Sequence, residues 1–303
     1  MTTVLVVGDV IDDIVVRPLA RATADSDTPS AITACPGGSG ANQAAWLGVL
    51  GTGVRFAGRA GAADVDAHAA ALAAAGVDAR LAADPGAPTG RIVVLARGGR
   101  RDMYTDRGAN LNLVPADLPD DLLDGVGLLH VSGYSLFHPA AGAAVGDLMR
   151  RARERGIDTS VDPGSAAFLA RTGAAAFRGW ARGARLIFPN LAEGRLLTGA
   201  REPAAVAAAL LADHPVVALK LGADGALIAA RDGTRLRLPS APTPVVDPTG
   251  AGDAFCAGFL TAWAAGHDLD GCARAAVRTA ARAVAAVGAR PAAIGRGCEP
   301  RPA

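Results

Sequence analysis

The sequence predicts an α/β fold in which a mostly parallel central sheet is covered by helices on both faces. From Gly127 onward, short apolar segments alternate with segments of helical spacing, which is typical of repeated βα units. Two glycine-rich turns each lead into a segment of helical spacing, and several of the expected strands end in polar residues. With 303 residues, 50% of them hydrophobic, the chain is long enough to bury a large core.

The expected strands and helices cover most of the chain. Strands are expected at residues 4–7, 54–57, 128–131, 158–161, 186–188, 216–219 and 226–230, and helices at 64–75, 140–155, 191–198, 204–211 and 270–287. Two further pairs of short strands fall within about residues 13–34 and 91–104. They predict a small β-sheet inserted in a single domain of residues 1–303. This sheet could be a lid that excludes water from a reaction, or an ordinary edge extension.

The composition argues against several classes of protein. A net charge of +1 gives no general affinity for nucleic acid or acidic membranes. No apolar run is long enough to span a bilayer, and the first residues lead directly into a strand, so we expect a cytoplasmic protein. The four cysteines lack CxxC or Cys/His spacing, so we expect reduced thiols and no metal centre formed by cysteines.

The stretch of residues 246–255 is the most informative part of the chain. Two apolar residues end an expected strand, a Pro/Thr/Gly turn follows, and helical spacing then begins near Gly250, Ala251 and Gly252. The free amides of a helix N-terminus bind anions, and glycines leave room for a phosphate. Asp253 lies in the same turn and is a candidate general base for an attacking hydroxyl. The alternative is that Asp253 only caps the helix, and the glycines only make a tight turn.

A second group of candidates lies in the N-terminal part. Asp13 follows the first strand, at the edge of an open α/β sheet where ligands bind, although a solvated acidic turn is the alternative. Gly37 and Gly38 precede a second helical segment and could bring backbone amides close to a ligand. Asn42, in the first turn of that helix, could contact a polyol or cap the helix.

Further polar residues follow later strands. Asn190 and Glu193 are three residues apart at a helix start, so they could hold hydrated Mg²⁺ and phosphate oxygens, or form a capping box. Lys220, the only lysine of the chain, is followed by Gly222 and Gly225, and these three could face nucleotide phosphates or make a hairpin turn. The alanine-rich helix at 270–287 could lie flat against an adenine or pack as an ordinary helix.

Two common nucleotide-binding motifs are absent from the sequence. No GxxxxGK[ST] occurs, which excludes a P-loop kinase. Neither glycine cluster completes GxGxxG, because Gln43 and Phe255 occupy the third glycine position, so a nicotinamide oxidoreductase is poorly supported.

Taken together, the two glycine motifs resemble those of the PfkB, or ribokinase-like, family of carbohydrate kinases. Residues 37–42 match the GGxxxN pattern of that family, and residues 247–255 match its DTxGAGDxF pattern with Pro248 inserted. The intervening NxxE of residues 190–193 supports the match, which covers residues 4 to about 293. The resemblance implies a ribokinase-like fold with a β-sheet lid and an ATP- and Mg²⁺-dependent kinase acting on a sugar or a sugar-like alcohol.

The resemblance also implies roles for individual residues. Asp253 matches the catalytic base, and Gly250, Ala251 and Gly252 match the anion hole for the transferred phosphoryl group. Matches to the acceptor-sugar site are Asp13, Gly37, Gly38 and Asn42. Asn190 and Glu193 match the metal and phosphate motif, with Mg²⁺ bound to Glu193 through water, and Lys220, Gly222 and Gly225 lie in the nucleotide segment. Some members bind a monovalent cation such as K⁺ near the residue that matches Asp247.

The sequence departs from particular members of that family. Ser132, Gly133 and Tyr134 stand where ribokinases have an acidic sugar ligand, which argues against ribose, and the Asn and Arg that follow Asp162 in several fructokinases and ketodeoxygluconate kinases are absent. A nucleoside kinase of the same family, or a binding protein that has lost catalysis, are the alternatives. A homodimer could form through an exposed face of the lid.

Overall fold

The computed structural model describes residues 2–22, 24–97 and 100–291, and contains two sheets of very different size. The larger sheet has nine strands in the order β13-β12-β11-β10-β9-β8-β1-β4-β5, and the smaller has four in the order β3-β2-β6-β7. All strand pairs of the larger sheet are parallel except β11 with β12 and β12 with β13. The predicted class, a mostly parallel α/β sheet with a small β-sheet lid, is confirmed.

The strands of the large sheet are β1 (Thr3–Val7), β4 (Val54–Gly61), β5 (Val77–Asp84), β8 (Val126–Ser132), β9 (Asp158–Asp162), β10 (Leu186–Ile187), β11 (Val216–Lys220), β12 (Ala226–Ala230) and β13 (Arg235–Leu238). The α-helices are α1 (Ser39–Val49), α2 (Val65–Ala73), α3 (Pro139–Glu154), α4 (Ala166–Thr172), α5 (Ala174–Trp180), α6 (Leu191–Thr198), α7 (Pro203–Leu210), α8 (Ala251–Ala264) and α9 (Leu269–Val284).

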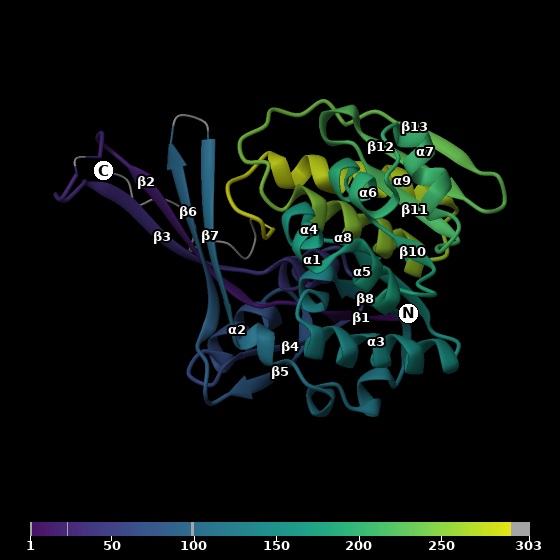
Figure 1. Cartoon of the computed structure of the whole chain (residues 1–303), viewed down its shortest axis with the longest axis horizontal. Coiled ribbons are helices and arrows are strands. Elements are labelled where there is room, and N and C mark those ends of the chain that lie inside the picture. The colour runs from purple at the N-terminus through teal and green to yellow at the C-terminus, as the bar shows by residue number, and fades with distance from the viewer. Residues whose placement is uncertain (1, 23, 98–99, 292–303) are drawn as a thin grey trace.

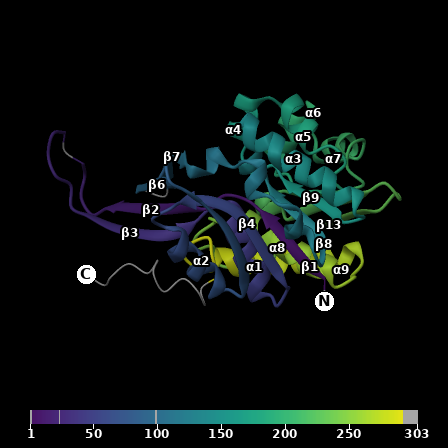
Figure 2. The same cartoon turned by 90° about the horizontal axis from the view of Figure 1, so that it is seen from below.

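Two hydrophobic cores lie on opposite faces of the large sheet. Strand β1 illustrates the reason, because successive side chains of a strand point to opposite faces. Val4 and Val6 pack with α1, α8 and α9, whereas Leu5 and Val7 pack with α3, α5 and α7. Figure 2 shows α3 to α7 on one side of the sheet and α1, α8 and α9 on the other. This double covering explains why the central strands are apolar without alternation.

The small sheet stands away from the body of the molecule (Figure 1). Its strands are β2 (Ile11–Pro18), β3 (Ser30–Gly37), β6 (Thr89–Arg97) and β7 (Arg100–Gly108). The predicted strand pairs are thus confirmed, although the central residues of the β6–β7 turn lie outside the described part. A buried ion pair joins this lid to the end of β1, since Arg107 Nη2 lies 2.9 Å from Asp9 Oδ2.

Some elements differ from expectation. The prediction of a strand that ends at Val246 is wrong. No strand follows β13 before α8, and the side chains of Val245 and Val246 are exposed. Pro239, Pro242 and Pro244 have no amide hydrogen to donate, which prevents regular pairing there. Strands β5 and β13 and helices α4 and α5 were not predicted, and α9 ends three residues earlier than expected.

Two other sequence-based expectations concern cysteines and membranes. Cys256 and Cys272 are buried free thiols, but Cys35 is disulfide-bonded, so the expectation of reduced thiols is wrong for Cys35. The fourth cysteine, Cys298, lies outside the described residues. Within the described ranges, every helix is too short or too polar to cross a membrane.

Candidate active site

The predicted helix N-terminus at residues 250–253 is present as the start of α8. Gly250 is the N-cap residue and has φ +76°, the left-handed region that favours glycine. A Cβ at Gly250 would lie 2.6 Å from Ala289 Cα, so a larger residue would also clash. In the described part of the chain, the amides of Gly252 and Asp253 have no hydrogen-bond acceptor, as is typical of the first turn of a helix.

The carboxylate of Asp253 faces α1 and does not cap its own helix. Its Oδ1 accepts hydrogen bonds from Ser39 Oγ at 2.6 Å and Gln43 Nε2 at 3.1 Å, and its Oδ2 accepts one from Asn42 Nδ2 at 3.2 Å. Burial raises the pKa of Asp253 to about 7, although the hydrogen bonds from Ser39 and Asn42 act in the opposite direction. The capping alternative for Asp253 is therefore wrong. A carboxylate with this pKa suits proton transfer near neutral pH.

Asp13, Gly37 and Gly38 lie together beside the start of α1. A Cβ at Gly37 would lie 2.2 Å from Asp13 Oδ2, so only glycine leaves room for that carboxylate. Gly38 has φ +93°, and a Cβ there would lie 2.4 Å from the carbonyl oxygen of Asp9. Burial, followed by the charge of Asp9, raises the pKa of Asp13 to about 7, and Arg290 opposes this change.

Asn42 connects this group to Asp253. Its side chain is 4% exposed, and while Nδ2 donates to Asp253, Oδ1 accepts a hydrogen bond from Arg290 Nε at 3.2 Å. Arg290 also donates from Nη2 to the carbonyl oxygen of Gly37 at 3.1 Å. Asn42 makes no cap for α1, so that alternative is wrong. Arg290 therefore fixes the orientation of the Asn42 amide, with its donor end toward Asp253.

On the other side of Asp253 lies a cavity of about 850 Å³. Its lining includes the candidate residues Asn190, Glu193, Lys220, Gly222, Gly225, Gly250, Ala251, Gly252 and Asp253, and the α9 residues Val277, Ala280, Ala281 and Val284. The volume is within the range of cofactor and drug-sized ligand sites. The α9 side chains give the cavity one apolar wall.

Asn190 and Glu193 form the capping box that was considered as an alternative. Asn190 Oδ1 accepts from the amide of Glu193 at 2.9 Å, and Glu193 Oε2 accepts from the amide of Asn190 at 2.8 Å. The second oxygen, Oε1, accepts from Asn190 Nδ2 at 2.7 Å. Burial raises the pKa of Glu193, and Lys220 opposes it. Since both oxygens are engaged, Glu193 fits a role behind a metal-bound water better than direct ligation.

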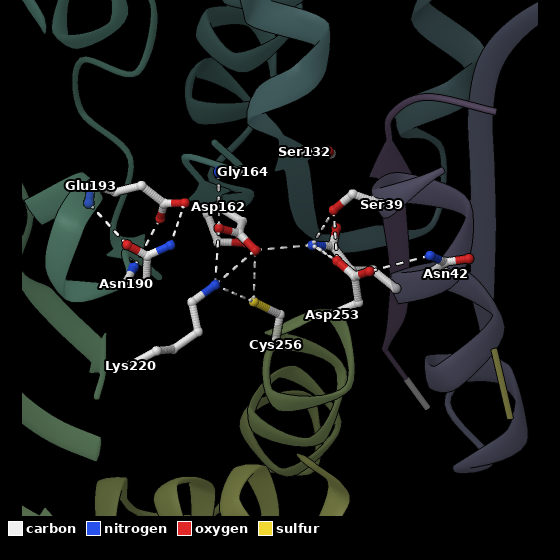
Figure 3. Close-up of polar contacts among 12 residues, drawn as sticks. Ser39, Asn42, Ser132, Asp162, Gly164, Asn190, Glu193, Lys220, Asp253 and Cys256 are labelled. Atoms are coloured by element: carbon white, nitrogen blue, oxygen red, sulfur yellow. Dashed lines mark hydrogen bonds and ion pairs between the residues drawn. The ribbon is translucent and has the colours of Figure 1, made fainter. Parts of the chain in front are cut away.

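Lys220 lies at the end of β11 in a buried ion pair. Its Nζ is 3.0 Å from Asp162 Oδ2 and 3.1 Å from Oδ1. Although burial lowers the pKa of Lys220, the charge of Asp162 outweighs it and raises the pKa above its ordinary value. The thiol of Cys256 also donates to Asp162 Oδ2, at 3.3 Å. In Figure 3, this cluster lies between the pair Asn190–Glu193 and the group around Asp253.

The hairpin-turn alternative for Gly222 and Gly225 is confirmed, since β11 and β12 pair antiparallel across them. Both have positive φ, and a Cβ at Gly225 would lie 2.0 Å from the carbonyl oxygen of Leu238. They nevertheless line the same cavity as Lys220. Asp247 is 8% exposed, and its oxygens accept from the amides of Thr249 at 2.8 Å and Gly288 at 3.1 Å.

Comparison with known proteins identifies the family to which this chain belongs. Residues 1–294 match the pfkB family carbohydrate kinases. The chain belongs to the pfkB family of carbohydrate kinases. It is 31% identical over 268 residues to a 1-phosphofructokinase of Rhodobacter capsulatus, covering 83% of this chain and 80% of that protein. The expected phosphotransferase with an alcohol group as acceptor is confirmed at the level of the family.

Further similar proteins and solved structures were found for this chain. The bifunctional protein HldE of Shewanella sediminis is 30% identical over 88% of this chain, which spans just over half, 56%, of that protein. The structure of adenosine kinase from Sinorhizobium meliloti superposes with a TM-score of 0.86 and 25% identity, covering 96% of each chain. A putative ribokinase II from E. coli in complex with ATP and Mg²⁺ has a TM-score of 0.85 at 24% identity, covering 95% of this chain and 94% of that chain, and confirms the ribokinase-like fold.

The structure thus brings the sequence-predicted residues of this chain together on two sides of Asp253, except Asp247, whose carboxylate is bonded to backbone amides and does not line the cavity. Sequence reasoning did not select Ser39, Gln43, Asp162 or Arg290 as site residues. Ser39 and Gln43 are four residues apart in α1 and share the helix face that carries Asn42, which was an available signal. Asp162 ends β9, where polar strand ends gather. Arg290 follows a Gly/Ala stretch that carried no such signal.

Proposed function

We propose that this protein transfers the γ-phosphoryl group of ATP to a hydroxyl of a sugar or sugar-like acceptor, with Asp253 as the general base. The observation that carries the proposal is the position of Asp253. Its carboxylate lies at the amide-rich start of α8, between the cavity that contains Lys220 and the group formed by Asn42 and Asp13.

In the proposed mechanism, the acceptor binds on one side of Asp253 and the nucleotide binds on the other. The acceptor binds beside Asp13, Gly37, Gly38 and Asn42. Its hydroxyl donates a proton to Asp253 as the oxygen attacks the γ-phosphorus, and the bond between that phosphorus and the bridging oxygen breaks to release ADP. The amides of residues 250–252 donate hydrogen bonds to the phosphoryl oxygens, where negative charge develops. Mg²⁺ would neutralise charge on the phosphates, held through water by Glu193. Asn190, Lys220, Gly222 and Gly225 would contact the nucleotide.

A coupled assay of ADP release over a panel of neutral sugars, sugar phosphates and nucleosides tests the proposal. We expect one class of acceptor to raise ADP release well above the rate without acceptor. A nucleoside as the best acceptor would replace the sugar assignment by a nucleoside kinase. Absence of release with every acceptor, together with a melting temperature raised by ATP-Mg²⁺ but not by NAD, would favour a binding protein that has lost catalysis.

We further propose that the whole chain forms one domain, into which the lid strands are inserted. We also propose that two copies of the protein form a homodimer through this lid. The lid carries exposed apolar side chains, with Ile32 66%, Met103 69% and Tyr104 62% exposed. Burial of such side chains against a second copy would remove apolar surface from water. We expect Ile32→Lys to yield a monomer in size-exclusion chromatography with light scattering, whereas Val114→Lys, at a 40% exposed site outside the lid, leaves the dimer intact. A wild-type protein that is monomeric in the same measurement would contradict the proposed dimer.

We also propose that a monovalent cation binds near Asp247. The buried Asp247 carboxylate accepts from two backbone amides in neighbouring loops, next to the start of α8. A cation bound there would add positive charge near the anion hole. Comparison of activity in K⁺ and in tetramethylammonium buffers of equal ionic strength measures the effect.

A further inference from the structure

Gln43 makes the hydrogen bonds that connect the two sides of the site. Its side chain is fully buried in α1. The amide nitrogen Nε2 lies 3.1 Å from Asp253 Oδ1 and 3.1 Å from Asp162 Oδ2. It also lies 3.3 Å from Ser39 Oγ. One neutral donor group is therefore shared between two carboxylates, and one of these is paired with Lys220.

The other end of the amide fixes its orientation. Gln43 Oε1 lies 3.1 Å from His130 Nε2, and His130 Nδ1 lies 2.8 Å from Ser160 Oγ. Burial lowers the pKa of His130 to about 4, so its ring is neutral at pH 7. A flipped amide would direct its carbonyl oxygen at two carboxylates, which is repulsive. Hence Oε1 accepts from the Nε2–H of His130, and Nδ1 accepts from the hydroxyl of Ser160.

We propose that Gln43 is a positioning residue for the base, which holds Asp253 in one orientation and separates its charge from that of Asp162. This inference rests on the proposed function, because it assumes that Asp253 accepts a proton. With Oδ1 held by Ser39 and Gln43, the oxygen Oδ2 stays on the side of Asn42, where the acceptor is proposed to bind. A base displaced by about 1 Å loses on the order of 10²-fold in rate.

The charged and titratable groups around Asp253 set the direction of the pH effect. They are Asp162 on β9, Lys220 on β11, Cys256 on α8 itself, and Tyr134 after β8. Asp162 raises the pKa of Asp253 and Lys220 lowers it. Removal of the Gln43 donor takes a hydrogen bond from the ionised carboxylate and leaves the two carboxylates without a donor between them. Both effects raise the pKa of Asp253 further.

The experiment compares Gln43→Met, Gln43→Glu and Ser160→Ala with the wild type. Methionine is close to glutamine in size but lacks the amide. We expect Gln43→Met to lower kcat about 10- to 100-fold, with KM for ATP nearly unchanged. The acid limb of the pH–rate profile should move up by about half to one unit, the equivalent of one hydrogen bond. Gln43→Glu adds a negative charge and should move the limb further.

Ser160→Ala is the matched control, because it breaks the far end of the same buried network without touching Asp253. We expect it to lower the melting temperature and to leave the acid limb at its wild-type position. An unchanged kcat and acid limb in both Gln43 variants, or an equal shift of the limb in Ser160→Ala, would overturn the inference. Failure of the proposed function is a separate result, since the wild type itself would then transfer no phosphoryl group.

Discussion

We expect Asp253→Asn to lower kcat by about 10²- to 10⁴-fold, the usual contribution of a positioned general base. Asparagine keeps the size of the side chain and can still accept from Ser39, but it cannot take a proton from the acceptor hydroxyl. Affinity for ATP should remain near that of the wild type, because the amides and Lys220 are unchanged. Initial rates in the coupled assay, with ATP binding measured by calorimetry, check both parts. A variant with wild-type kcat would exclude Asp253 as the base.

The same substitution should stabilise the fold at alkaline pH. The pKa of Asp253 is raised from 3.8 to about 7 in the folded chain. Its contribution to stability is therefore fully present below pH 3.8 and is lost as the pH rises through about 7, where the buried carboxyl must ionise. Melting temperatures should show Asp253→Asn above the wild type at about pH 8, with a smaller difference at about pH 5. A lower melting temperature of the variant at the higher pH would contradict this.

Of the substitutions discussed, Lys220→Met should lower the stability of the fold most. The side chains of Lys220 and Asp162 are 14% and 4% exposed, so the substitution leaves a buried carboxylate without its cation. Breaking a buried ion pair in this way costs about 3–5 kcal/mol. Gln43 and Cys256 still donate to Asp162, but neither is charged at neutral pH. Urea unfolding measures the loss, and calorimetry should show weaker binding of ATP.

Two controls separate the buried charge from other effects of Lys220→Met. Arg274→Met removes an exposed ion pair with Asp270, in which the two side chains are 61% and 44% exposed, and should change the stability little, because solvent screens such a pair. The double variant Lys220→Met/Asp162→Asn removes both charges and should recover part of the stability. If Lys220→Met costs no more than Arg274→Met, the pair does not have the structural importance that we assign to it.

The sequence was sufficient to predict the elements whose signals are local. The change from a Pro/Thr/Gly turn to helical spacing predicts the start of α8, and with it the position of Asp253. Likewise, the three-residue spacing of Asn190 and Glu193 predicts both the capping box and their shared face. The pair Val245 and Val246 was misleading, because apolar β-branched residues form a strand only where a neighbouring strand can pair with them.

Partners that are distant in sequence could not be predicted in the same way. Ser39 and Gln43 donate hydrogen bonds to Asp253, from which they are separated by 214 and 210 residues in the sequence. The spacing of residues within one segment contains no information about such contacts. Gln43 entered the sequence argument only as a residue that breaks a glycine motif. Its function as a donor between Asp162 and Asp253 depends on how α1, β9 and α8 meet at one edge of the sheet.

The pH dependence of kcat/KM for the acceptor, at saturating ATP-Mg²⁺, tests the role of Asp253 most directly. For the wild type, activity should rise about tenfold per pH unit below the pKa and level off above about 7, as Asp253 ionises in the free enzyme. The residual activity of Asp253→Asn should lack this limb. A wild-type profile that is flat through this range, or a variant that retains the same limb, would contradict the assignment of Asp253 as the base.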